Sequence, residues 1–174
     1  MNLDAQRGLR LLSEIGASPW LVRHHELVLE AATLLCDLVF RRLDLNFDRE
    51  QVLTGAAVHD AGKIVHPEEM SEPGHQHELA GQRLLMEHGV EPRLARFCVT
   101  HASWNAPRTA IEDLLVALAD KLWKGKRETE LEQVVANAIA RDTKREAWEV
   151  FEALDSICEE VAAEGPARLA RSVV

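Results

Sequence analysis

The stretch AAVHDAGKIV, residues 56–65, places the ionisable pair His59-Asp60 in the middle of an otherwise apolar run. Burying a carboxylate without a partner is costly, so Asp60 needs a cation nearby if this run lies in the core. An arginine, a lysine or a metal ion would each meet that need. The residue types in the rest of the chain indicate which of these three partners Asp60 has.

The rest of the chain has helical periodicity nearly throughout, and no stretch alternates like a strand. Ser18 and Asp48 are favourable N-caps, and Pro19 suits the first position of a helix. The predicted helices cover residues 3–16, 18–44, 49–63, 77–89, 91–104, 110–126 and 128–165, the last as one long helix or as two helices broken near Asp142. We therefore predict an all-α bundle of about six to eight helices. It forms a single domain over residues 1–165, followed by a tail over residues 166–174.

Composition and charge restrict the class of protein. The 174 residues suit one domain, and the formal net charge of −9 disfavours broad binding to bulk nucleic acid or anionic lipid. Cys36, Cys98 and Cys158 are far apart in apolar helical contexts, which indicates buried free thiols in a reducing compartment. The N-terminus has no apolar signal-peptide region, and no apolar stretch is long enough to span a bilayer. We expect a cytoplasmic protein with no membrane partner.

Side chains that bind metal ions recur on separate predicted helices. The candidates are His24 or His25, His59, Asp60, His77, His101 and Asp120. In helical bundles, metal sites are commonly built from side chains that project inward from facing helices. Imidazole and carboxylate together suit zinc, iron, manganese or nickel rather than an ion that prefers thiolates. His59 and Asp60 point about 100° apart on a helix, so they can reach one ion from adjacent sides, or Asp60 can bridge two ions.

Each of these residues also has an interpretation without a metal. A single histidine on an amphipathic helix is more often a surface or hydrogen-bonded core residue, and this applies above all to His66, His75 and His88. Asp120 could be a buried carboxylate that pairs with Lys121 or Arg127. Only the joint pattern of histidines and aspartates favours a metal site.

The joint pattern resembles the HD-domain metal-dependent phosphohydrolases over about residues 18–127. The matching segments, in chain order, are RHHELVLEAA, AAVHDAGK, HELAGQRLL, FCVTHASW and ALADKLWKGKR. HDAGK matches the HD-x-GK element of the family, whose His-Asp pair binds a catalytic divalent metal inside a helical core. The pattern looks closest to two-metal members such as the symmetrical diadenosine-tetraphosphate hydrolases. It lacks the GYP signature of the cyclic-di-GMP phosphodiesterases, since His101 is followed by ASWNAPR.

The resemblance implies a role for each matching residue. The implied ligands of the first metal are His24 (with His25 as the alternative), His59, Asp60 and Asp120. His77 and His101 match the additional histidines of two-metal members, and Asp60 would then bridge both ions. Lys63 matches the family lysine near the scissile phosphate, so Asp60 and Lys63 are the catalytic candidates. One or two divalent transition metal ions per chain are expected, either iron, manganese, zinc or nickel.

The implied reaction is hydrolysis of a phosphate ester or anhydride of a small substrate, such as a nucleotide, by a metal-activated water. Lys121, Lys124 and Arg127 lie in the basic segment KLWKGKR and could attract this substrate despite the acidic net charge. Alternatively, they are cations at a helix C-terminus, where they are favourable without any ligand. The helix predicted over residues 128–165 either closes the core or forms a homodimer face.

Two other classes of protein fit the same residues. The HD fold also occurs in mixed-valent diiron oxygenases that resemble myo-inositol oxygenase, and their ligand set is similar. Iron content and oxygen consumption would separate such an enzyme from a hydrolase. A non-catalytic nucleotide-binding sensor is the other alternative. The intact set of ligands argues against it, because degenerate members usually lose several.

Overall fold

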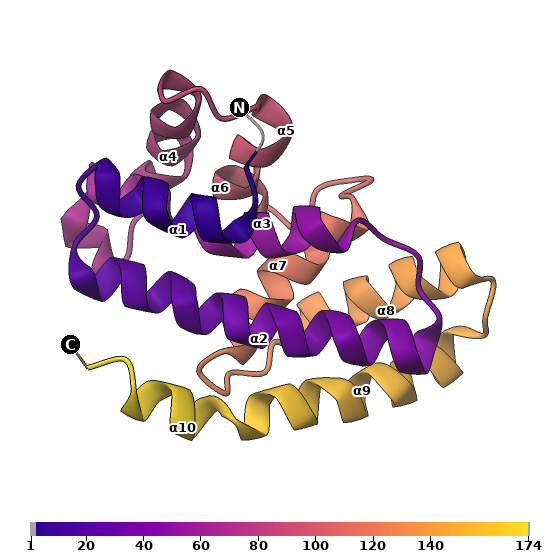
Figure 1. The fold of residues 1–174 in the computed structure, drawn as a ribbon. Coiled ribbons are helices and arrows are strands. Elements are labelled where there is room, and N and C mark those ends of the chain that lie inside the picture. The colour runs from indigo at the N-terminus through magenta and orange to yellow at the C-terminus, as the bar shows by residue number, and fades with distance from the viewer. Residues whose placement is uncertain (1–2, 174) are drawn as a thin grey trace.

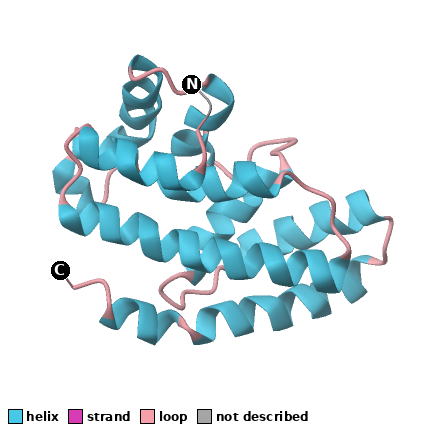
Figure 2. Cartoon of the chain, viewed as in Figure 1, coloured by secondary structure: helices cyan, strands magenta, loops and turns pink. Residues whose placement is uncertain are grey.

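The computed structural model describes residues 3–173, and within this range it contains helices and loops but no strand (Figure 1; Figure 2). The longer α-helices are α1 (Ala5–Glu14), α2 (Pro19–Leu43), α3 (Arg49–Val58), α4 (Gln76–Glu87), α7 (Ile111–Leu122), α8 (Thr129–Thr143) and α9 (Ala147–Ala163). The short helical segments are η1 (Ala61–Ile64), η2 (Pro67–Met70), α5 (Pro92–Ala95), α6 (Phe97–Thr100) and α10 (Gly165–Ala170). The predicted all-α bundle is confirmed.

The helices α2 and α3 begin where the sequence places their capping residues. The Ser18 hydroxyl accepts a hydrogen bond from the backbone N–H of Leu21 at 3.2 Å. The Asp48 carboxylate accepts one from the N–H of Gln51 at 3.0 Å. Each contact satisfies one of the backbone donors that the first turn of a helix leaves without an intrahelical partner.

The end of α3 differs from the prediction, because the helix stops at Val58 instead of continuing to residue 63. His59 and Asp60 therefore lie in the turn between α3 and η1. Gly62 accounts for this change of direction: a Cβ at this position would clash with the backbone carbonyl of His77. Only glycine lets η1 approach the start of α4 so closely, and this approach brings His77 to the turn that carries Asp60.

The C-terminal part of the chain also departs from the prediction. α8 and α9 are separate helices, as in the alternative with a break near Asp142. Residues 166–170 of the predicted tail belong to the helix α10, which begins at Gly165, and the side chain of Arg168 is buried. Arg168 donates to the Glu30 carboxylate at 3.2 Å and to the carbonyl of Val161 at 2.8 Å. These contacts hold α10 against α2 and α9.

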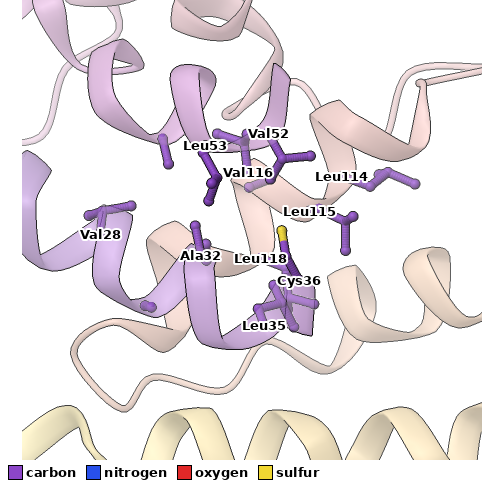
Figure 3. Close-up of a cluster of buried hydrophobic side chains, with 14 of the residues drawn as sticks. Val28, Ala32, Leu35, Cys36, Val52, Leu53, Leu114, Leu115, Val116 and Leu118 are labelled. Carbon is purple, nitrogen blue, oxygen red and sulfur yellow. The ribbon is translucent and has the colours of Figure 1, made fainter. Parts of the chain in front are cut away.

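The core forms around α2, which lies between α1 and α3 on one side and α9 on the other (Figure 1). Figure 3 shows apolar side chains of α2, α3 and α7 that meet there, namely Val28, Ala32, Leu35, Cys36, Val52, Leu53, Leu114, Leu115, Val116 and Leu118. Burying an aliphatic side chain of this size contributes roughly 1.5–3 kcal/mol. The packed core thus fixes the relative positions of the helices whose residues form the polar site described below.

The three cysteines Cys36, Cys98 and Cys158 are buried free thiols, as predicted. None of the helices in the described part of the chain has the length and apolar character needed to cross a membrane.

Candidate metal centre

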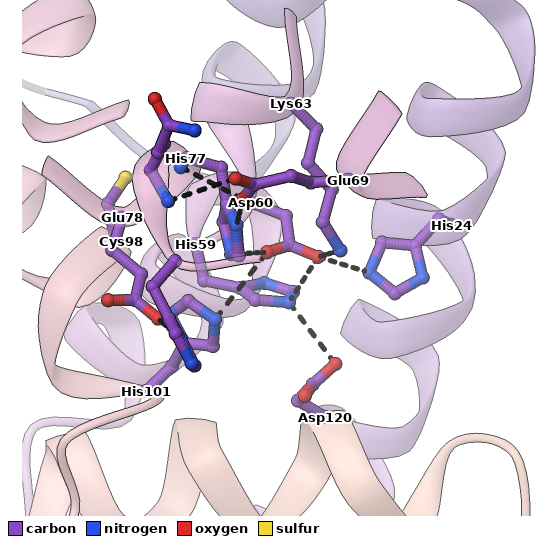
Figure 4. Close-up of polar contacts among 12 residues, drawn as sticks. His24, His59, Asp60, Lys63, Glu69, His77, Glu78, Cys98, His101 and Asp120 are labelled. Carbon is purple, nitrogen blue, oxygen red and sulfur yellow. Dashed lines mark hydrogen bonds and ion pairs between the residues drawn. The ribbon is translucent and has the colours of Figure 1, made fainter. Parts of the chain in front are cut away.

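Six predicted ligands from five different segments meet in one place (Figure 4). They are His24 of α2, His59 and Asp60 after α3, His77 in the first turn of α4, His101 at the end of α6, and Asp120 of α7. Five of the six residues are buried and Asp120 is partly buried. The structure therefore brings together residues that are up to 96 positions apart in the sequence, from His24 to Asp120.

The carboxylate of Asp60 lies between two groups of imidazoles. Its Oδ2 atom is 3.2 Å from His24 Nε2 and 3.7 Å from His59 Nε2. Its Oδ1 atom is 3.3 Å from His77 Nε2 and 3.5 Å from His101 Nε2. Each oxygen thus faces its own pair of ring nitrogens, so Asp60 could contribute one oxygen to each of two ions.

Asp120 completes the first of these groups. Its Oδ1 atom lies 3.4 Å from His59 Nε2, and its Oδ2 atom accepts from the Lys121 ammonium at 3.1 Å. The ligand atoms of His24, His59, Asp60 and Asp120 all lie within 4.8 Å of one another, and so do those of Asp60, His77 and His101. We call these the first ligand set and the second ligand set; they share Asp60.

The ring orientation of three histidines is set by what their Nδ1 atoms contact. His59 Nδ1 is 3.0 Å from the carbonyl oxygen of Ala56, and His101 Nδ1 is 2.9 Å from that of Phe97. His77 Nδ1 is 2.5 Å from the carboxylate of Glu69. An acceptor at Nδ1 favours the tautomer with the proton there, and this leaves the Nε2 lone pair directed at Asp60.

Several polar atoms at the centre are buried without a hydrogen-bond partner of good geometry. Among the described residues these include both ring nitrogens of His24, His59 Nε2 and Asp60 Oδ1. Leaving such groups unsatisfied costs about 1–3 kcal/mol each, and more for charged groups. A divalent ion bound by imidazole nitrogens and carboxylate oxygens would satisfy these atoms together, so the residues present fit a transition metal.

The electrostatics of the centre favour a cation. Burial by itself would raise the pKa of Asp60, but the surrounding imidazoles, with His59 first among them, hold it well below the usual range. Burial likewise opposes ionisation of Asp120, and His59 and Lys121 keep its pKa well below the usual range. Both carboxylates are therefore ionised at neutral pH, and together they attract a positive charge to the space between them.

The imidazoles respond to the same surroundings in different directions. Burial lowers the pKa of His101 to about 4, so its ring is neutral at neutral pH and keeps a lone pair for coordination. Burial also opposes protonation of His59, but Asp60 and Asp120 outweigh it and raise the pKa of this ring. The carboxylates thus draw a cation toward His59, whether a proton or a metal ion.

The structure distinguishes His24 from His25. His24 belongs to the first ligand set, and its ring is stacked on Trp20 at 6.0 Å and meets the edge of Trp123 at 5.1 Å. His25 belongs to neither set. Its Nδ1 atom is instead 3.2 Å from the carbonyl of Ala56, the same carbonyl that His59 contacts. His25 thus supports the backbone that orients His59, while His24 faces Asp60.

A cavity of about 500 Å³ opens next to the ligands, a size within the usual range of small-molecule sites. Its lining includes the ligands His24, Asp60, His77, His101 and Asp120, the lysines Lys63, Lys121 and Lys124, the aromatic residues Trp20 and Trp123, and Leu169 and Ser172 near the C-terminus. Lys63 donates to Asp60 Oδ2 at 2.6 Å. The cavity therefore combines cationic side chains beside the ligands with an aromatic and apolar wall.

One of the residues predicted to bind substrate, Arg127, lies elsewhere. Arg127 does not line the cavity, because its guanidinium donates to Glu132 at 2.7 Å and to Asp155 at 2.6 Å and so joins α8 to α9. This pairing favours the alternative in which Arg127 has a structural role and does not bind substrate. His66 contacts Glu68, and His88 is exposed at the end of α4. Neither residue belongs to the first or the second ligand set.

Glu69 is a site residue that the sequence analysis missed. Its buried carboxylate contacts the ring of His77 and also accepts from the backbone N–H groups of Gln76 at 3.0 Å and His77 at 3.1 Å. Burial alone would raise its pKa, but these contacts with His77 and the two amides lower it to about 2. Glu69 lies in the segment HPEEMSEPGHQ, where no periodic pattern marks one glutamate over its neighbour.

Comparison with known proteins gives one family and one relative. The family model described as HD domain matches residues 21–125. The chain is 29% identical over 150 residues to a protein of Thermoplasma volcanium named tRNA (cytidine(56)-2'-O)-methyltransferase. The match covers 77% of this chain but only 40% of that protein, so the chain spans about two fifths of the length of this relative. No solved structure matches the chain.

Proposed function

The chain belongs to the HD-domain family, and from this we propose that it is a metal-dependent phosphohydrolase. Its substrate is a phosphate ester or anhydride, and the class that fits the cavity best is a small phosphorylated compound such as a nucleotide. The observation that carries this proposal is that Asp60 lines the cavity while its two oxygens face two separate pairs of imidazoles.

The two ligand sets would hold two divalent ions with Asp60 between them. When bound, such ions polarise phosphoryl oxygens and lower the pKa of a water ligand towards roughly 7. The rigid carboxylate of Asp60 belongs to both sets, so it fixes how they lie relative to each other. The Nδ1 contacts of His59, His77 and His101 hold the rings so that they need not reorganise during the reaction.

Lysines of the cavity supply positive charge for the phosphoryl group. Lys63 lies beside Asp60, close to where the reacting phosphate would bind, and can neutralise charge that develops on it. Lys121 and Lys124 line the same cavity and attract an anionic substrate into an otherwise acidic protein. The ammonium groups of Lys121 and Lys124 therefore contribute to binding of the substrate. The ammonium group of Lys63 contributes to stabilising the transition state.

The aromatic wall supports a substrate with a planar group. Trp20 lines the cavity with 39% of its surface exposed, and Trp123 lies nearby. Stacking of a nucleobase on an aromatic side chain contributes roughly 1–3 kcal/mol. A nucleotide would place its phosphate at the lysines and its base at Trp20. The methyl transfer in the name of the Thermoplasma relative is not part of the proposal, because the chain spans only 40% of that protein.

The test is a hydrolysis screen of nucleotides and dinucleoside polyphosphates with protein loaded separately with manganese, iron, zinc and nickel. The variant Asp60→Ala should have no turnover above background, because it removes the shared ligand. His88→Ala replaces an exposed histidine away from the ligands and should hydrolyse the substrate at the rate of the unaltered protein.

Three results would contradict the proposal. Full turnover by Asp60→Ala would exclude the metal-based mechanism. Oxygen consumption by the iron-loaded protein without phosphate release would identify a diiron oxygenase instead. Saturable nucleotide binding without turnover under all four metals would identify a non-catalytic sensor.

A further inference from the structure

We propose that Glu69 is a positioning residue that fixes the ring of His77 so that its Nε2 lone pair faces Asp60 Oδ1. The inference rests on the proposed function, because it presumes that His77 binds a metal ion. The carboxylate of Glu69 would then orient this ligand of the second ligand set. Glu69 comes from η2, a segment separate from all six ligands. It is therefore an addition to the ligand set and not one of its members.

The contact between Glu69 and His77 is short, buried and aimed at one ring nitrogen. Glu69 Oε2 lies 2.5 Å from His77 Nδ1, and the side chain of Glu69 is only 4% exposed. On the other side of the ring, His77 Nε2 lies 3.3 Å from Asp60 Oδ1. With a carboxylate at Nδ1, the proton of a neutral imidazole lies there, and Nε2 is left as the atom that binds an ion.

The backbone is built to hold Glu69 in this place. Oε1 accepts from the N–H of Gln76, and Oε2 accepts from the N–H of His77 as well as from its ring. A Cβ at Gly74 would overlap the carboxyl group of Glu69, so a larger residue at this position would displace the carboxylate from its place beside His77. The same carboxylate therefore fixes both the backbone and the ring of His77.

A purely structural role for Glu69 is the competing explanation. The N-cap residue of α4, His75, makes no side-chain capping hydrogen bond, and the Glu69 carboxylate satisfies two amides of the first turn in its place. A helix cap accounts for these two amide contacts. It does not account for the ring contact, and the two roles predict different results for the state of the His77 ring.

The experiment compares Glu69→Ala and Glu69→Gln with Glu68→Ala, whose exposed glutamate is the adjacent residue in the sequence. Burial opposes protonation of the His77 ring, but Asp60 and Glu69 outweigh it and raise the pKa of this ring. Long-range ¹⁵N correlation spectra of the histidine rings, recorded with a chelator present and at a pH high enough for the ring to be neutral, therefore report the tautomer of His77 without any bound ion. Titration with manganese then measures the affinity for each equivalent of metal. Glu69→Gln keeps an acceptor for Nδ1 and remains informative if Glu69→Ala does not fold.

We expect the Nδ1–H tautomer of His77 in the unaltered protein and in Glu68→Ala, a mixture of tautomers in Glu69→Ala, and mainly the Nδ1–H form in Glu69→Gln. The second equivalent of manganese should bind about 10- to 100-fold more weakly to Glu69→Ala, while the first is unchanged. Glu69→Gln should lose less affinity than Glu69→Ala.

An unchanged His77 tautomer and unchanged affinity in Glu69→Ala would overturn the inference and leave Glu69 as a helix cap, even if the melting temperature fell. Failure of the proposed function gives a different result. If the unaltered protein binds manganese but hydrolyses nothing, the tautomer and affinity data still support or overturn the role of Glu69.

Discussion

At the scale of single residues, the candidate centre depends on Asp60, whose two oxygens face two pairs of imidazoles. The adjacent pair His24-His25 shows how neighbouring residues of one type take different roles. His24 faces Asp60, whereas His25 contacts the carbonyl of Ala56. Sequence spacing alone left both as candidates for the first ligand.

We expect His24→Ala to bind one metal ion fewer than the unaltered protein, because the first ligand set loses one of its four members. His25→Ala should keep both ions but unfold more easily, by about 2–5 kcal/mol, since it leaves a cavity in the core. Metal analysis of the purified variants together with urea unfolding measures both effects. Loss of an ion from His25→Ala, with none lost from His24→Ala, would contradict the assignment.

A second residue-scale prediction concerns His101 and pH. Burial lowers its pKa to about 4, whereas the unfolded chain has an ordinary histidine pKa of about 6.5. Between these values the unfolded state binds more protons, so the contribution of His101 to stability falls as the pH is lowered through this range. With a chelator present, the unaltered protein should lose stability relative to His101→Asn between pH 6.5 and 4, by a few kcal/mol in order of magnitude.

Urea unfolding of both proteins across this pH range is the measurement. The difference between the two free energies of unfolding removes the titration of groups distant from His101, because these are common to both proteins. What remains is the titration of His101 together with its coupling to Asp60 and His59. A difference that does not change with pH would mean that the ring is not held neutral in the folded state.

The residues of the site divide into those that could be predicted and those that could not. His59, Asp60 and Asp120 lie in short segments with a recognisable order, so their joint pattern pointed to one centre. Glu69 could not be found, because its contact with His77 depends on how a loop containing Gly74 folds back. Arg127 was predicted to bind substrate, since nothing local in the sequence indicates its pairing with Glu132 and Asp155.

At the scale of elements, the starts of helices were predictable and their ends less so. Ser18 and Asp48 cap their own helices through contacts three residues away, which are visible in the sequence. The end of α3 depends on the close approach of Gly62 to α4, a contact between segments. α10 depends in the same way on the pairing of Arg168 with Glu30, which lies 138 residues away in the chain.

α10 forms part of the cavity wall through Leu169, and two arginines hold the helix to Glu30. Glu30→Ala should lower the free energy of unfolding by about 1–3 kcal/mol, because the buried guanidinium of Arg168 loses its carboxylate partner. The KM of the substrate found in the screen should also rise, since a loosened α10 leaves the cavity wall incomplete. Thermal unfolding and steady-state kinetics test the two effects.

Glu160→Ala is the matched control, since it removes one exposed partner of an ion pair between α9 and Arg42 of α2. Exposed pairs of this kind contribute about 0–1 kcal/mol. If Glu160→Ala and Glu30→Ala had equal effects on both stability and KM, the specific role of α10 would be excluded.

At the scale of the whole molecule, the three buried thiols report on the integrity of the core. Burial raises the pKa of Cys36 and of Cys158 to about 12, and it raises that of Cys98 as well. At pH 8 the folded protein should therefore react with a thiol reagent only as fast as it opens, because the thiolate is the reactive form. Rapid labelling of any cysteine in the native protein would contradict this packing.

The central claim is that two ligand sets share Asp60, and the most direct test is the metal content of the purified protein, measured element by element. After reloading with manganese, iron, zinc or nickel, we predict two equivalents per chain. His101→Ala should keep one equivalent, and Asp60→Ala should keep none. A single equivalent in the unaltered protein, or two equivalents retained by Asp60→Ala, would contradict the account.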